Sequence, residues 1–126
     1  MLDPDLLAFV RSSIPSIWAL ELLLLIRRAA PGYLTRDELV QHLRATPTLI
    51  DRLLERLEAA RLVSRNDTGA VRFECGSPEL ENLCEALATA ADERPIALRD
   101  AIISMPNEKL RDFSEAFRFK DKDKGK

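Results

Sequence analysis

The sequence has little of what small stapled proteins and many enzymes depend on. It contains one histidine, two cysteines and four glycines in 126 residues. Cys75 and Cys84 are too few for a disulfide framework, and their spacing fits no common zinc pattern. The chain has no glycine-rich phosphate loop, no nucleophile beside a base and no cluster of metal ligands. We therefore expect no enzymatic activity, no cofactor and no metal, and we expect both thiols to stay reduced.

Long apolar runs are absent as well. The longest, residues 22–26, is far too short to span a bilayer, which needs about 20 residues. The N-terminus is acidic where a signal peptide would be basic. We expect a cytoplasmic protein without a membrane partner. Because Leu, Ala, Glu and Arg dominate and strong strand formers are few, we also expect a mostly α-helical fold.

Basic charge is scarce overall, with a net charge of −2, but it is unevenly distributed. Residues 27–72 carry nine Arg against six acidic residues, a net charge of +3. Residues 73–117 carry four basic against ten acidic residues, a net charge of −6. The tail, residues 118–126, carries five basic against two acidic residues, a net charge of +3. The positive charge is therefore concentrated in the middle of the chain and in the tail, as nucleic-acid binding requires.

The stretch 35–73 is the most informative part of the chain. Thr35 is a typical helix N-cap, and Glu38 completes a capping box. Pro47 cannot continue that helix but suits the first turn of a new one, with Thr46 as its cap. In the second helix, which we place at residues 47–61, the apolar residues Ile50, Leu53, Leu54 and Leu57 have helical spacing.

The pattern then changes to that of a β-hairpin. Residues 62–65 and 70–73 are short strand candidates on either side of the turn sequence Asn66-Asp67-Thr68-Gly69. Helix, turn, helix and hairpin therefore follow one another in this order.

This run, LTRDELVQHLRATPTLIDRLLERLEAARLVSR followed by NDTG, resembles the winged helix-turn-helix of MarR- and ArsR-like bacterial regulators. The resemblance covers roughly residues 15–75. It implies a winged helix-turn-helix core, mostly α with a small β-hairpin, flanked by N- and C-terminal helices. It also implies a DNA-binding transcriptional regulator that reads the major groove with helix 47–61 and contacts the DNA backbone with the wing, residues 62–74.

Further helices flank this core on both sides. Two helices are predicted before it: one from Asp3 to about Ser12, and one from Pro15 to about Ala29, capped by Ser13 or the Ile14 region. Three more are predicted after it, at residues 77–92, 96–105 and 106–117. We expect one domain over residues 1–117, with the helix-turn-helix at 35–61 and the C-terminal helices at 77–117. The tail at 118–126 is expected to be disordered and basic.

Many regulators of this kind dimerise through such flanking helices, so a homodimer is expected, the alternative being that the helices fold back on their own core. Trp18 fits a core or subunit interface better than a ligand-stacking site. Glu21 in the same helix fits either a solvated edge or an ion pair.

Opposite its apolar side, helix 47–61 presents Thr48, Asp51, Arg52 and Glu55. Arg52 is the candidate for a bidentate guanine contact, and Thr48 for a base or a phosphate. The full set of candidate DNA-binding residues is Arg36, Arg44, Thr46, Thr48, Arg52, Arg56, Arg65 and Arg72. Asp51 and Glu55 oppose DNA binding unless they accept a hydrogen bond from a cytosine amino group or hold an arginine in position. Helical spacing suggests the latter, with Arg52 and Arg56 as the partners. A winged helix that docks a protein partner without sequence-specific DNA binding is therefore the alternative.

Overall fold

The computed structural model describes residues 2–103, and the order of its elements follows the predicted one. The elements, with their bounds, are α1 (Pro4–Ser13), α2 (Ile17–Ala29), α3 (Arg36–Leu43), α4 (Pro47–Ala59), β1 (Val63–Arg65), β2 (Val71–Phe73), α5 (Pro78–Glu93) and α6 (Pro95–Ile103). The predicted mostly helical fold with one small hairpin is confirmed. The helix expected at 106–117 and the tail at 118–126 lie outside the described residues.

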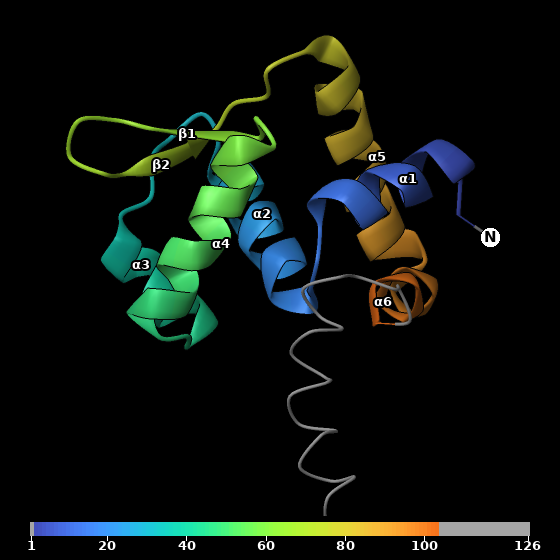
Figure 1. Cartoon of the computed structure of the whole chain (residues 1–126), viewed down its shortest axis with the longest axis horizontal. Coiled ribbons are helices and arrows are strands. Elements are labelled where there is room, and N and C mark those ends of the chain that lie inside the picture. Colours follow the sequence, from blue (N-terminus) through green and yellow to red (C-terminus); the bar gives the residue numbers. More distant parts are fainter. Residues whose placement is uncertain (1, 104–126) are drawn as a thin grey trace, which may run out of the picture.

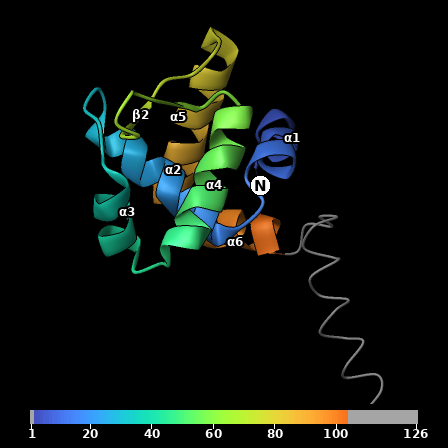
Figure 2. The ribbon, with the colours of Figure 1, turned by 60° about the vertical axis from the view of Figure 1, so that its left-hand side comes forward.

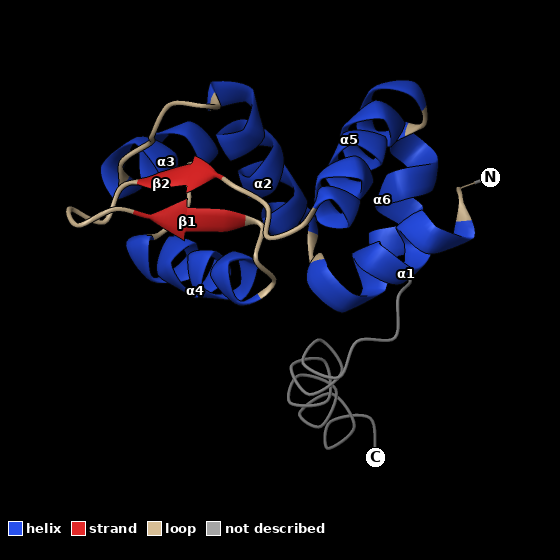
Figure 3. Ribbon diagram, turned by 90° about the horizontal axis from the view of Figure 1, so that it is seen from above, coloured by secondary structure: helices blue, strands red, loops and turns tan. Residues whose placement is uncertain are grey.

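The elements gather into two groups (Figure 1 and Figure 3). On one side, α2, α3 and α4 pack together beneath the hairpin, with α2 against β2 and α4 against β1. On the other side, α1, α5 and α6 contact one another. Helix α2 also touches α6, and α4 lies in front of α2 in the views of Figure 1 and Figure 2. The helix-turn-helix and the flanking helices are thus joined through α2.

Local hydrogen bonds explain where α3 and α4 begin and end. The capping box is formed, because the Thr35 amide donates to Glu38 Oε1 (2.8 Å) and the Glu38 amide donates to Thr35 Oγ1 (3.1 Å). Arg44 ends α3 in the left-handed conformation, with φ of 54°. Thr46 then caps α4 by accepting from the Leu49 amide (3.1 Å). The corner between the two helices is therefore fixed by side chains within it.

The hairpin is closed by the predicted turn. Strands β1 and β2 are antiparallel, and Ser64 lies opposite Arg72. Asn66 Oδ1 accepts from the Ala70 amide (3.0 Å), and Gly69 adopts a φ of 89° that suits glycine. Leu34, before α3, forms a bridge to β2, which extends the small sheet by one residue pair.

The core is one continuous cluster of apolar side chains that reaches both groups of elements. Helix α2 contributes most to it, as expected from its apolar sequence, and Glu21 occupies its solvated edge. Side chains that are at most 1% exposed come from all parts of the fold and include Leu22, Leu23, Ile26, Leu39, Ile50, Leu54, Leu57, Leu62, Val71, Leu87, Leu98 and Ile102.

The structure corrects three details of the prediction. Helix α2 begins at Ile17 and not at Pro15, because Ser16 is its cap and accepts from the Ala19 amide (3.2 Å). Helix α4 ends at Ala59 and not at residue 61, since Arg61 has a φ of 64°. Trp18 is 42% exposed, so it does not belong to the core. The expectation that it lies in a subunit interface stays a prediction.

Among the described residues, no single helix is long and apolar enough to cross a membrane. Together α1 and α2 reach that length and composition, but a 103° bend separates them and both contribute side chains to the core.

We predict that Leu57→Ala lowers the free energy of unfolding by about 2–5 kcal/mol, because Leu57 is fully buried on α4 and its truncation leaves a cavity. Urea unfolding followed by circular dichroism measures this change. The control is Glu55→Ala on the exposed side of the same helix, expected to change stability by less than about 0.5 kcal/mol. Equal effects of both substitutions would contradict the packing described here.

Candidate nucleic-acid interface

The exposed side of α4 is the centre of the candidate interface. We call it the recognition face and define it by Thr48, Asp51, Arg52, Glu55 and Ala59, which share one side of the helix. All except the partly buried Asp51 are exposed. The opposite side of α4 is buried, so the helix cannot turn to present other residues. The arrangement predicted from helical spacing is therefore present.

Asp51 on this face is held by an arginine from α3. Arg36 Nε donates to Asp51 Oδ1 and Arg36 Nη2 donates to Asp51 Oδ2, both at 2.7 Å. The hydrogen bond from Arg36 holds the pKa of the Asp51 carboxyl below its ordinary value. The sequence suggested pairing with Arg52 or Arg56 of the same helix, but the partner of Asp51 is Arg36 of the neighbouring helix α3. The pair neutralises Asp51 and orients Arg36.

The corner between α3 and α4 and the first turns of α4 carry the remaining polar groups. Arg44, Thr48 and Arg52 are exposed and have no side-chain partner within residues 2–103. Thr46 is also exposed, but its Oγ1 is engaged in capping α4. These side chains surround the N-terminal half of α4, where the backbone N–H groups of the helix end give a partial positive charge.

The C-terminal half of the recognition face lies in different surroundings. It borders an open hollow of about 450 Å³, lined by the end of α1 and the end of α4: Ser12, Ser13, Glu55, Arg56, Ala59 and Ala60. Arg56 therefore lies toward α1, apart from Thr48 and Arg52. Among the predicted site residues on α4, Thr48 and Arg52 therefore lie together, whereas Arg56 is separate from them.

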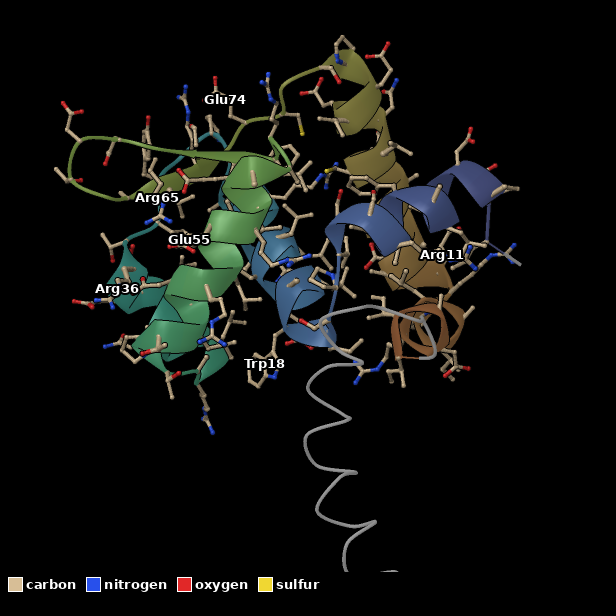
Figure 4. All side chains as sticks on the ribbon, viewed as in Figure 1. Arg11, Trp18, Arg36, Glu55, Arg65 and Glu74 are labelled. Carbon is tan, nitrogen blue, oxygen red and sulfur yellow. The ribbon has the colours of Figure 1, made fainter. Side chains whose placement is uncertain are left out.

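The arginines of the hairpin have carboxylate partners and point in two directions. Arg65 Nη2 lies 2.9 Å from Glu58 Oε1, which places Arg65 against α4 on the underside of the hairpin (Figure 4). Arg72 is on the opposite face with Ser64, where its Nη2 lies 3.3 Å from Glu74 Oε1. Its guanidinium also lies over the Tyr33 ring, 5.3 Å from the centroid.

The charged side chains of α3, α4 and the hairpin lie on two different faces. Arg36, Glu55 and Arg65 lie on the same side of α4, whereas Glu74 extends from the other face of the hairpin (Figure 4). Arg72 belongs with Glu74 and therefore points away from α4. The Ser64 hydroxyl donates to Glu74 Oε1 (2.6 Å), and this hydrogen bond, followed by the charge of Arg72, lowers the pKa of the Glu74 carboxyl. Ser64, Arg72 and Glu74 therefore hold one another in place.

Two contacts went unnoticed in the sequence: Arg36 with Asp51, and Arg72 with Tyr33. Each joins residues far apart in the chain, and no local pattern indicates them. No group of three or more potential metal ligands occurs in the part of the chain that the structure describes.

Comparisons with known proteins bear on the fold. No protein-family model and no curated protein matches the chain. Two solved structures of Staphylococcus aureus MepR are similar to it. A mutant bound to an oligodeoxyribonucleotide is 15% identical, with a TM-score of 0.52, and the match covers 97% of this chain and 88% of that one. The second structure is of MepR as a transcription regulator of the S. aureus multidrug efflux pump MepA. It is 16% identical to this chain, with a TM-score of 0.51, and the match covers 97% of this chain and 91% of that one. The predicted winged helix-turn-helix with flanking helices is therefore confirmed as the fold.

We predict that the Asp51 carboxyl titrates below its ordinary pKa and that Arg36→Gln moves its midpoint upward, because the main cause of the shift is lost. Since the folded-state pKa is lowered, the ion pair stabilises the fold above the unfolded-state pKa of about 3.9 and ceases to do so as pH falls through the folded value. Carboxyl NMR during an acid titration measures both midpoints. Arg99→Gln, on α6, is the control and should leave the Asp51 midpoint unchanged. An unshifted midpoint in the unmodified protein would contradict the pair.

Proposed function

We propose that this protein binds double-stranded DNA as a transcription regulator and inserts α4 into the major groove. The observation that carries the proposal is the exposed N-terminal half of α4, which presents Thr48 and Arg52 beside Arg44 with no carboxylate partner among the described residues. The fold supports it, because MepR, whose structure includes a bound oligodeoxyribonucleotide, has the same architecture. The proposed role is non-catalytic and places the protein in the cytoplasm with its DNA.

Arg52 is the proposed base-reading residue. A major groove about 12 Å wide admits an α-helix, and a guanidinium can donate two hydrogen bonds to O6 and N7 of guanine. Arg52 is exposed on the recognition face and belongs to no ion pair in residues 2–103, so both donors are available. Thr48 is one helical turn earlier on the same side, and its hydroxyl can donate to a base or a phosphate.

The phosphate contacts are assigned to the groups around α4. Arg44 and the N-terminus of α4 offer positive charge at one edge of the recognition face. Arg36 uses Nε and Nη2 for Asp51, which leaves Nη1 to donate to a phosphate oxygen. The Arg36–Asp51 pair thus acts as a positioned donor with little net charge.

The wing is assigned a smaller role than α4. Arg65 is beside α4 and is partly neutralised by Glu58, while Arg72 is on the far face of the hairpin with Glu74. Within residues 2–103, few cations without a carboxylate partner are therefore placed to contact the DNA backbone. Binding by this part of the chain should show a shallow salt dependence compared with proteins that make six to ten phosphate contacts.

The proposal includes a homodimer formed by the terminal helices. Ile96 is 74% exposed and Ile103 is 62% exposed. They are seven residues apart on α6 and so share one side of the helix. A second copy seated on this side would bury them. A two-fold dimer would also match two half-sites about 34 Å apart.

The alternative, a winged helix that docks a protein, is favoured by a different surface. Trp18 projects from the start of α2 (Figure 4), and Glu21, Leu25, Arg28 and His42 line a hollow of about 380 Å³ between α2 and α3. An aromatic side chain beside a shallow mixed surface is a common feature of protein interfaces.

To test DNA binding, we predict that Arg52→Ala weakens binding to a selected target roughly tenfold to a hundredfold and relaxes its base preference. The substitution removes a bidentate base contact but no buried group. Fluorescence anisotropy with DNA from upstream of the protein's own gene, across several salt concentrations, measures affinity and salt slope.

Arg11→Ala, an exposed arginine on the far side of the molecule (Figure 4), is the matched control and should bind like the unmodified protein. If the unmodified protein shows no salt-dependent binding, the DNA proposal fails. If Arg52→Ala retains both affinity and base preference, the role of Arg52 fails.

For the dimer, we predict a mass of about twice 14.2 kDa by light scattering and a monomeric mass for Ile96→Glu. A carboxylate in an apolar interface has no partner and is costly to bury. Gln41→Glu, which adds the same charge on exposed α3, is the control and should remain dimeric. A 14.2 kDa species of the unmodified protein at tens of micromolar, as an approximate working range, would contradict the dimer.

A further inference from the structure

The two cysteines meet where the hairpin leads into α5. Cys75 follows β2, and Cys84 is in the second turn of α5. Cys75 Sγ donates a hydrogen bond to Cys84 Sγ, with 3.9 Å between the sulfur atoms. Cys84 is fully buried, whereas Cys75 is partly exposed. One thiol is therefore accessible from solvent, and the other lies behind it in contact.

The backbone on both sides of this contact is held in place. The Glu74 amide donates to the Leu62 carbonyl (3.1 Å), and the Gly76 amide donates to the Arg61 carbonyl (2.8 Å). These bonds fix the chain directly before and after Cys75. Ser77 caps α5 by accepting from the Leu80 amide (3.2 Å), which fixes the start of the helix that carries Cys84. The two sulfur atoms are thus brought together by the fold itself.

We propose that Cys75 and Cys84 form an oxidation site, at which a peroxide converts the two thiols into an intramolecular disulfide. The sequence alone indicated two ordinary reduced thiols, because nine-residue spacing carries no information about contact in space. The proposal does not depend on DNA binding, and its test needs no DNA.

The chemistry proceeds in two balanced steps. Cys75 loses its thiol proton, and the thiolate attacks one peroxide oxygen as the O–O bond breaks, which gives a sulfenic acid and hydroxide; the hydroxide takes up the proton that the thiol released and leaves as water. The Cys84 sulfur then attacks the Cys75 sulfur, the S–S bond forms, and the S–O bond breaks. The leaving hydroxide takes the Cys84 proton and departs as a second water. Overall the thiols lose two electrons and two protons, and hydrogen peroxide is reduced to two molecules of water.

The surroundings make this site slow to react near neutral pH. Burial raises the pKa of Cys75 and, more strongly, that of Cys84. Glu81 on α5 acts in the same direction, and Arg27 on α2 opposes it. Because the thiolate is the reactive form, oxidation should accelerate at alkaline pH. A site of this kind responds to sustained oxidation and not to brief exposure.

The disulfide would join the exit of the wing to α5. It would therefore tie the hairpin side of the molecule to the side formed by α1, α5 and α6. A disulfide restricts the unfolded chain, and the short loop between Cys75 and Cys84 keeps this effect moderate, so we expect a rise in the thermal unfolding midpoint on the order of 5 °C or more.

Peptide mass spectrometry of the full-length chain tests the proposal directly. The protein is treated with hydrogen peroxide, denatured, alkylated and digested with trypsin. Both cysteines fall in one peptide, residues 73–99, because Pro95 protects the bond after Arg94 and no other Lys or Arg intervenes. This peptide contains no methionine, so methionine oxidation does not complicate its mass.

We expect the oxidised peptide to lose two hydrogen atoms and to accept no alkyl groups, and we expect dithiothreitol to restore both alkylation sites. Oxidation should be several-fold faster at about pH 9 than at neutral pH. Cys75→Ser is the matched control, which retains buried Cys84 and should show one alkylated thiol and no loss of hydrogen.

Three results would overturn the proposal: two or three oxygen atoms gained at Cys75 without a disulfide, a disulfide between two copies of the chain, or two alkylated thiols after methionine elsewhere has been oxidised. Each would show that the 3.9 Å contact does not lead to a bond.

Discussion

Burial of α2 is the constraint on which the rest of the structure depends. This helix is apolar nearly all round, and Leu22, Leu23 and Ile26 are completely buried. Each such side chain contributes roughly 1.5–3 kcal/mol when removed from water, so the helix is stable only if neighbours cover it on several sides. Those neighbours are α3, α4 and β2 on the winged side and α6 on the other. The same requirement turns the polar side of α4 outward.

The arginines of the winged side are of two kinds: some are held in ion pairs, and others have no carboxylate partner among the described residues. Asp51, Glu58 and Glu74 each hold an arginine, and these exposed pairs add little to stability. Their main effect is to restrict where the guanidinium groups point. Two of the arginines that have no carboxylate partner within residues 2–103, Arg44 and Arg52, are at the α3–α4 corner and on the recognition face. A modest net charge of the winged segment is therefore compatible with a localised positive surface.

The parts of the fold that could be predicted from the sequence are those with local causes. The Thr35–Glu38 capping box and the Asn66–Gly69 turn involve residues within four positions of one another, and both were identified correctly. The cap of α2 was misplaced because Ser13 and Ser16 both precede the apolar segment and either side chain could serve.

The directions of the arginines could not be predicted in the same way. Arg72 is on the outer face of the hairpin because of the strand register, and a shift of one residue would reverse it. Arg36 meets Asp51 only because α3 and α4 cross at a fixed corner. The direction of Arg72 and the contact of Arg36 with Asp51 both depend on how separate elements pack together. Capping residues and apolar periodicity do not predict this packing.

The bridge between Leu34 and Val71 has a mechanical consequence. Its two backbone hydrogen bonds, 2.7 and 2.8 Å long, fasten the segment before α3 to the first residue of β2. The chain from α2 through β2 is thereby closed into a ring of mutually anchored elements. The guanidinium groups of Arg44, Arg52 and Arg65 are therefore carried by elements that are fastened to one another. The exit from the hairpin is held as well, because the Glu74 and Gly76 amides donate to the Leu62 and Arg61 carbonyls.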